Sequence, residues 1–230
     1  MGFVTRIVCL ANSRKRDGHC VAGLELDENG KLGRWIRPVG PRESESLVPD
    51  ERRYADGTEP QLLDVIEMTL LERFPCGHQT ENYRPHPGRP WKRIGKLSCA
   101  RLAPAVQKFP GSLWFDGPSG GYGFNDKVPA DKLAAFSYSL LLLVPDRIRI
   151  EVQEEGNPKK KKVRADLLFG YKHYLLPVTD PVAEHHFACR GLGKFSCPPL
   201  PLCVSLSKPY PGPGGPCYKL VAALIGLPNS

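Results

Sequence analysis

The chain has 230 residues, of which 41% are hydrophobic and 24% charged, a balance that excludes wholesale disorder and gives room for one large or two small domains. Glycine and proline are frequent, with 23 and 24 residues, which favours short strands and turns over long helices. The net charge of +8 at pH 7 favours a polyanionic partner, nucleic acid first, although solubility alone also accounts for a basic surface.

Eight cysteines occur without an apolar signal segment at the start of the chain. Apolar runs such as residues 140–144 are far shorter than the roughly 18 to 20 residues that a bilayer span requires. We therefore expect reduced thiols, a cytoplasmic location and no membrane contact.

The first half of the chain predicts a hairpin and several further strands. Residues 3–10 are bulky and β-branched and predict a buried strand that ends at residues 11–13. Residues 19–26 and 32–39 flank an Asn-Gly turn, which supplies the positive φ angles of a tight hairpin. We then expect a polar loop or short helix over 41–60, a strand over 62–72, an irregular segment over 75–90 and a strand over 89–97.

The second half also predicts short strands separated by turns, and it does not repeat the sequence of the first half. A glycine-rich break at 117–123 precedes a short helix over 130–136, and residues 147–152 alternate polar and apolar side chains, as a strand with one wet face does. Residues 218–227 suit either a second helix or a closing strand. Further strands are expected over 137–144, 162–169 and 171–178.

These nine or ten strands fall into two groups of similar size that join near residues 109–111. We therefore predict an all-β fold with one or two short helices, arranged as two small barrels in tandem over 1–110 and 111–230. A single β-sandwich remains the structural alternative.

Basic and aromatic side chains gather near the predicted first hairpin. Arg14 and Lys15 follow the first strand, from where long side chains can reach phosphate oxygens, although a solvated basic loop has the same sequence. Trp35 and Arg37 share one face of a strand, which Ile36 does not. If this face of the strand is exposed, Trp35 would stack on a base and Arg37 would bind a phosphate. If the same face points inward, Trp35 would fill the barrel interior.

The segment 76–82 concentrates polar and reactive side chains. The amides of Gln79 and Asn82, with His78 beside them, are candidates for reading base edges, although such amides also stabilise loops. His78 and Glu81 would serve as general base and acid only if their surroundings shifted their pKa values. Loop scaffolding is the more frequent role.

Two other clusters favour structural roles. His186, Cys189, Cys197 and Cys203 offer soft zinc ligands, but the chain has no Cys-x-x-Cys pair, so buried reduced cysteines are the better interpretation. Four lysines at 159–162 resemble a nuclear localisation signal, but at a predicted hairpin tip they favour solubility and add nonspecific attraction to phosphates. Phosphate-loop, dinucleotide and zincin motifs are absent, which lowers support for those enzyme classes.

Several short blocks occur in a fixed order along the chain. They are 10–15 (LANSRK), 18–23 (GHCVAG), 35–38 (WIRP), 63–65 (LDV), 78–82 (HQTEN), 178–181 (VTDP) and 218–223 (YKLVAA). In this order the blocks resemble the bacterial dual OB-containing domain family. This resemblance implies two OB folds in tandem and, more weakly, recognition of nucleic acid or nucleotides, and it carries no catalytic residues. Residues 209–217 depart from the expected pattern through their proline and glycine content.

The combined prediction is a non-enzymatic protein that binds single-stranded DNA or RNA through basic loops and aromatic stacking. In it Arg14, Lys15 and Lys172 contact phosphates, Trp35 stacks a base beside Arg37, and Gln79 and Asn82 add polar contacts. No cofactor is expected. The alternatives are a nucleotide sensor or enzyme with a pocket around His78 and Glu81, and a protein-interaction module with exposed apolar faces.

Overall fold

The computed structural model describes residues 2–107 and 111–227, which form two compact units, Met1–Ala105 and Val106–Ser230. The first unit ends at Ala105, five residues before the predicted boundary between residues 110 and 111. Residues 108–110, next to that predicted boundary, lie outside the described part of the chain. No helix in the described ranges is long and apolar enough to cross a membrane.

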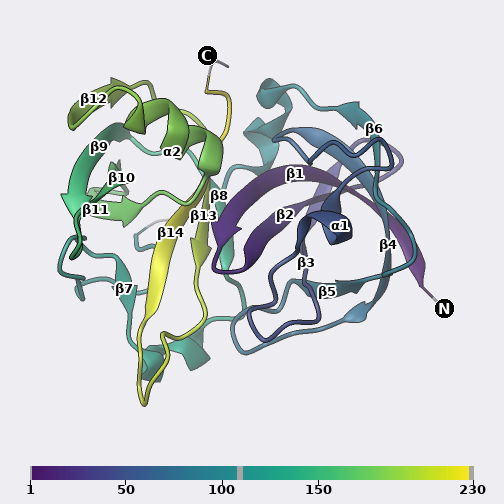
Figure 1. Cartoon of the computed structure of the whole chain (residues 1–230), viewed down its shortest axis with the longest axis horizontal. Helices are drawn as coiled ribbons and strands as arrows, with labels where there is room; N and C mark the ends of the chain where they lie inside the picture. Colours follow the sequence, from purple (N-terminus) through teal and green to yellow (C-terminus); the bar gives the residue numbers. More distant parts are fainter. Residues whose placement is uncertain (1, 108–110, 228–230) are drawn as a thin grey trace. The chain divides into compact units, whose positions relative to one another are not determined.

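The first unit is a closed barrel of five strands (Figure 1). Its strands follow the order β1-β2-β3-β5-β4, and β4 pairs back onto β1. Only the β3–β5 pairing is parallel, which is the Greek-key closure of an OB fold. The strands are β1 (Phe3–Lys15), β2 (Gly18–Leu26), β3 (Leu32–Pro38), β4 (Asp64–Arg73) and β5 (Asn82–Pro85).

Short elements complete the first unit. The helix α1 (Pro49–Arg52) lies in the β3–β4 connection, β6 (Lys92–Lys96) pairs with β4, and the 3-10 helix η1 (Cys99–Ala105) follows. In the β2–β3 turn, Gly30 has a φ of 75° and the Asp27 carboxylate accepts hydrogen bonds from the backbone N–H groups of Asn29 and Lys31. The predicted hairpin is confirmed, but of the Asn-Gly pair only Gly30 has a positive φ, and Asp27 stabilises the rest of the turn.

The second unit repeats the strand order with a broken first strand. β8 (Leu140–Leu143) pairs with β13 (Leu202–Leu206), and β9 (Arg147–Glu155) pairs with β10 (Lys160–Phe169), so β8 and β9 together match β1 of the first unit. β11 (Lys172–Pro177) pairs with β10, and Val178 just beyond it bridges in parallel to Val221 of β14 (Cys217–Leu224), which pairs with β13. The circuit is again that of an OB barrel.

The remaining elements of the second unit flank this barrel, and the inward residues of its strands form one apolar core. α2 occupies the connection between the third and fourth barrel strands, as α1 does in the first unit. These elements are β7 (Lys127–Val128), the 3-10 helix η2 (Ala130–Ala135), α2 (Pro181–Ala188) and β12 (Gly193–Cys197).

The structure corrects several predicted elements. β1 continues to Lys15 instead of ending at residues 11–13, because its polar second half pairs with β2. The irregular segment 75–90 contains β5, and of the two alternatives for 218–227 the closing strand is confirmed, with β14 spanning Cys217–Leu224. The described ranges contain fourteen strands instead of nine or ten, and the sequence analysis missed α2, whose N-cap Asp180 accepts hydrogen bonds from the Val182 and Ala183 N–H groups.

Candidate nucleic-acid interface

The predicted basic loop of the first unit is the end of a hairpin. Arg14 is exposed and Lys15 half-buried, and both lie on β1, opposite His19 and Gly18 of β2. The pKa of His19 is lowered by burial and by the positive charge of Arg52, with a smaller contribution from Arg14. Positive charge is therefore concentrated at this end of the barrel, where the first two strands turn.

Trp35 lies on the outer side of β3. Its neighbour Ile36 belongs to the barrel core, so Trp35 points to the opposite face, where it is half-buried. Within the described residues its indole N–H donates no hydrogen bond. Part of an aromatic side chain is thus exposed on β3, with a donor that has no partner in the described residues.

Arg37 does not form the predicted surface pair with Trp35. Its side chain is only 4% exposed, its Nε donates to Asn82 Oδ1 at 2.8 Å, and its Nη2 donates to Glu81 Oε1 at 2.5 Å. Glu81 and Asn82 are buried as well. This cluster fastens β3 to the start of β5, so Arg37 and Asn82 support the face that carries Trp35.

The side chains of the segment 76–82 point inward to a greater extent than the sequence suggests. His78 and Gln79 are 5% and 4% exposed, and the backbone groups of Cys76 and Gln79 bond to each other across a tight turn. A pocket of about 620 Å³ does lie in the first unit, but neither His78 nor Glu81 belongs to its lining. Its walls come from the segment after β3, from α1 and from the segment after β5, including Val39, Leu47, Arg53, Arg84, His86 and Arg89.

The candidate zinc ligands do not assemble. Among the residues that the structure describes, no group of three or more His, Cys, Asp or Glu side chains is placed to hold a metal ion. His186 lies on α2 and Cys189 directly after it, Cys197 ends β12, and Cys203 is buried within β13. The expectation of buried cysteines is confirmed for Cys203 but wrong for Cys189, which is exposed, and Cys197 is half-buried.

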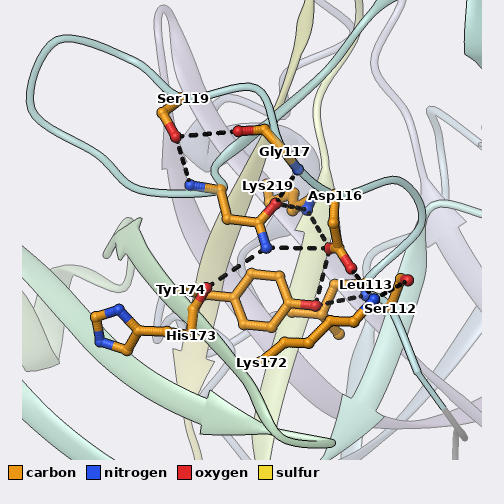
Figure 2. A network of polar contacts seen from close by, with 10 residues as sticks. Ser112, Leu113, Asp116, Gly117, Ser119, Lys172, His173, Tyr174 and Lys219 are labelled. Carbon is orange, nitrogen blue, oxygen red and sulfur yellow. Dashed lines mark hydrogen bonds and ion pairs between the residues drawn. The ribbon is translucent and has the colours of Figure 1, made fainter.

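The second unit contains a buried lysine with several polar neighbours (Figure 2). Lys219 of β14 is fully buried, and it shares the inward side of the strand with Cys217 and Val221 of the core. Its Nζ lies 3.3 Å from Asp116 Oδ1 and 3.3 Å from Asn125 Oδ1, and 4.9 Å from the centre of the Tyr174 ring. A charged group thus occupies one end of the barrel interior.

Asp116 is the common acceptor of this network. Lys172 Nζ donates to its Oδ2 at 2.6 Å, and the Tyr174 hydroxyl donates to its Oδ1 at 2.9 Å. Burial alone would raise the pKa of Asp116, but the hydrogen bonds lower it to about 2. Burial lowers the pKa of Lys219 to about 8 against the opposing effect of Asp116. Lys172, predicted to contact phosphate, is therefore already paired with a carboxylate.

Sequence reasoning missed Asp116, Asn125 and Lys219. One signal was present, because Lys219 stands between apolar residues on the inward side of an otherwise apolar strand. A lysine in that position requires a buried counter-ion. The segment that supplies it, before β7, has no regular structure for a pattern to reveal.

No curated protein and no solved structure matches the chain at a significant level. The family model described as the dual OB-containing domain matches residues 5–224. This match covers nearly the whole chain, and the two barrels have the strand order of OB folds. The chain therefore belongs to the dual OB-containing domain family.

Proposed function

We propose that the protein binds single-stranded nucleic acid without catalysis, with Trp35 of the first barrel stacking against a base. The supporting observation is the position of Trp35 on the outer side of β3, partly exposed and with an indole N–H that has no acceptor among the described residues. In OB folds the face of the second and third strands and the neighbouring loops are the surface that binds oligonucleotides. Stacking of one base on an aromatic side chain contributes about 1–3 kcal/mol.

The charges near this face support the same proposal. Arg14 is exposed near the end of the β1–β2 hairpin, Arg16 is exposed in its turn, and the whole chain carries a net charge of +8. Cations in this position neutralise phosphates and release counter-ions, which is the sequence-independent part of nucleic-acid binding. Arg37 has no direct part in the proposed contact, because its guanidinium is bonded to Glu81 and Asn82.

Fluorescence anisotropy with labelled single-stranded DNA, single-stranded RNA and duplex tests this proposal. We expect Trp35→Ala to weaken single-strand binding by about 5- to 150-fold, the equivalent of 1–3 kcal/mol. Tyr171→Ala is the matched control, because Tyr171 is 99% exposed in the second unit and distant in sequence from Trp35. Equal affinity of the Trp35→Ala variant and the wild type, with unchanged thermal stability, would contradict the proposal.

The pocket of the first unit favours a second candidate, a nucleotide-binding role. Its volume of about 620 Å³ falls within the roughly 300–1,000 Å³ of small-molecule sites. Arg89 in its wall is exposed and forms no hydrogen bond through its side chain or ion pair within the described ranges, so it is available for a phosphate. Titration calorimetry with nucleoside monophosphates, for the wild type and Arg89→Ala, tests this role.

The predicted cytoplasmic location stays a prediction.

A further inference from the structure

Two exposed aromatic side chains lie on the glycine-rich loop (residues 117–126) of the second unit. Tyr122 and Phe124 are both 51% exposed. The backbone of Phe124 bonds in both directions to Leu175, so this part of the loop runs alongside β11. The ring of Phe124 lies 5.5 Å from that of His173, which is exposed on the same strand. Three rings thus lie next to the outer face of the second barrel.

A run of lysines adjoins these rings. The Tyr122 hydroxyl accepts a hydrogen bond from the Gly156 N–H at 3.2 Å, which places Tyr122 beside the β9–β10 turn. Lys160 and Lys161 at the start of β10 are exposed and form no ion pair within the described residues. Lys159, the last residue of the turn, has only Glu154 at 3.7 Å. Residues 154–162 hold four lysines against two glutamates, so this hairpin end has an excess of positive charge next to exposed aromatic surface.

The glycine-rich loop is held in place from inside the barrel (Figure 2). Asn125 Oδ1 accepts the Gly117 N–H at 2.8 Å, and Asp126 Oδ1 accepts the Gly120 N–H at 2.6 Å. The buried Lys219 contributes its backbone N–H to the Asp126 carbonyl oxygen and its Nζ to Asn125. A loop fixed in this way loses little conformational freedom when a ligand binds.

We propose that this loop is a second stacking site for single-stranded nucleic acid, in which Tyr122 and Phe124 stack on bases and the lysines of the β9–β10 hairpin neutralise phosphates. The inference rests on the proposed function and extends it to the second barrel. A single strand is favoured over a duplex because its unpaired bases expose the faces that exposed rings can stack on. The lysines alone would attract an acidic protein surface as well as a nucleic acid. The exposed rings beside them favour nucleic acid, because its bases can stack on the rings.

The test uses the full chain and labelled oligothymidine of about 20 nucleotides in anisotropy titrations. We expect the double substitution Tyr122→Ala/Phe124→Ala to weaken oligothymidine binding at least tenfold when it is introduced into the wild type. Introduced into the Trp35→Ala variant, it should weaken the remaining binding by a similar factor. Tyr171→Ala again serves as the exposed-aromatic control. Thermal melting of each variant establishes that the barrel remains folded.

A second readout locates the contact independently of affinity. Oligonucleotides containing iodouridine should crosslink on irradiation to Tyr122 or Phe124, as identified by mass spectrometry of the peptides. Binding that Trp35→Ala weakens but the loop variant does not, without loop crosslinks, would overturn this inference and leave the first-barrel proposal intact. Binding that only the loop variant weakens would overturn the Trp35 proposal instead, and failure of the wild type to bind any single strand would overturn both.

Discussion

At the scale of single residues, the buried pair of Arg37 and Glu81 is the strongest stability determinant that we predict for the first unit. Arg37→Ala leaves the carboxylate of Glu81 buried without its cation, so we expect the free energy of unfolding to fall by about 3–5 kcal/mol. Denaturant titration measures this change. The control is Arg34→Ala, whose exposed pair with Glu25 should cost less than about 1 kcal/mol. Similar values for the two variants would refute the structural role of Arg37.

The buried Lys219 makes a prediction about pH. Its pKa is lowered from 10.5 in the ordinary state to about 8 in the folded chain, so between these values the unfolded chain binds more protons than the folded one. The contribution of Lys219 to the free energy of unfolding therefore becomes more favourable to the folded state as the pH increases from about 8 to 10.5. Burial raises the pKa values of Tyr174 and Cys217, which act in the opposite direction at high pH. The difference between the wild type and Lys219→Met isolates the lysine.

Thermal melts of both proteins at pH 7.5, 8.5, 9.5 and 10.5 provide this comparison. We expect the wild type to gain stability relative to Lys219→Met as the pH rises across this series. A constant difference in melting temperature would show that Lys219 has a normal pKa in the folded chain.

The alternation of side chains along a strand correctly placed Trp35 and Arg37 on one face and Ile36 on the other. It did not predict that Arg37 would be buried on that face. Burial of Arg37 depends on Glu81 and Asn82, more than forty residues later in the chain. Local sequence therefore predicts the direction of a side chain, and a distant segment decides whether solvent reaches it.

At the scale of elements, a hairpin with a local turn signal was predictable, whereas a short strand inside an irregular polar segment was not. The β2–β3 hairpin pairs neighbouring segments through an Asn-Gly turn. By contrast, β5 has four residues and pairs in parallel with β3, so its existence depends on barrel closure. The helix α2 did carry a local signal, because Asp180-Pro181 provides an N-cap and a proline in the first turn.

The glycine-rich loop gives a prediction at this scale. A Cβ atom at Gly123 would overlap the carboxylate of Asp126, which holds the loop through the Gly120 N–H. Gly123→Ala should therefore displace the loop and weaken single-strand binding while the barrel stays folded. Gly121→Ala is the matched control, since its Cβ would meet no atom within 4 Å. Amide hydrogen exchange over 117–126 should increase in the Gly123→Ala variant alone, and equal exchange in both variants would contradict this account.

At the scale of the whole molecule, the chain contains the same barrel twice without a visible sequence repeat. Each unit has the strand order of an OB fold and a helix between its third and fourth barrel strands. The composition and the spacing of turns predicted two small barrels, because those properties depend on many residues at once. The buried polar clusters differ, with Arg37 and Glu81 in one unit and Lys219 and Asp116 in the other, and pattern alone predicted neither.

The final prediction concerns the salt dependence of binding by the whole chain. If hairpin lysines neutralise phosphates, Lys160→Glu/Lys161→Glu should reduce the slope of log affinity against log salt by about 0.7 for each phosphate that is no longer neutralised. Lys92→Glu/Lys132→Glu changes the net charge equally at exposed positions on β6 and η2, outside both proposed sites. It should lower affinity slightly and leave the slope unchanged. Equal slopes for the two variants between about 50 and 200 mM salt would mean that net charge, and not the β9–β10 hairpin, governs the attraction.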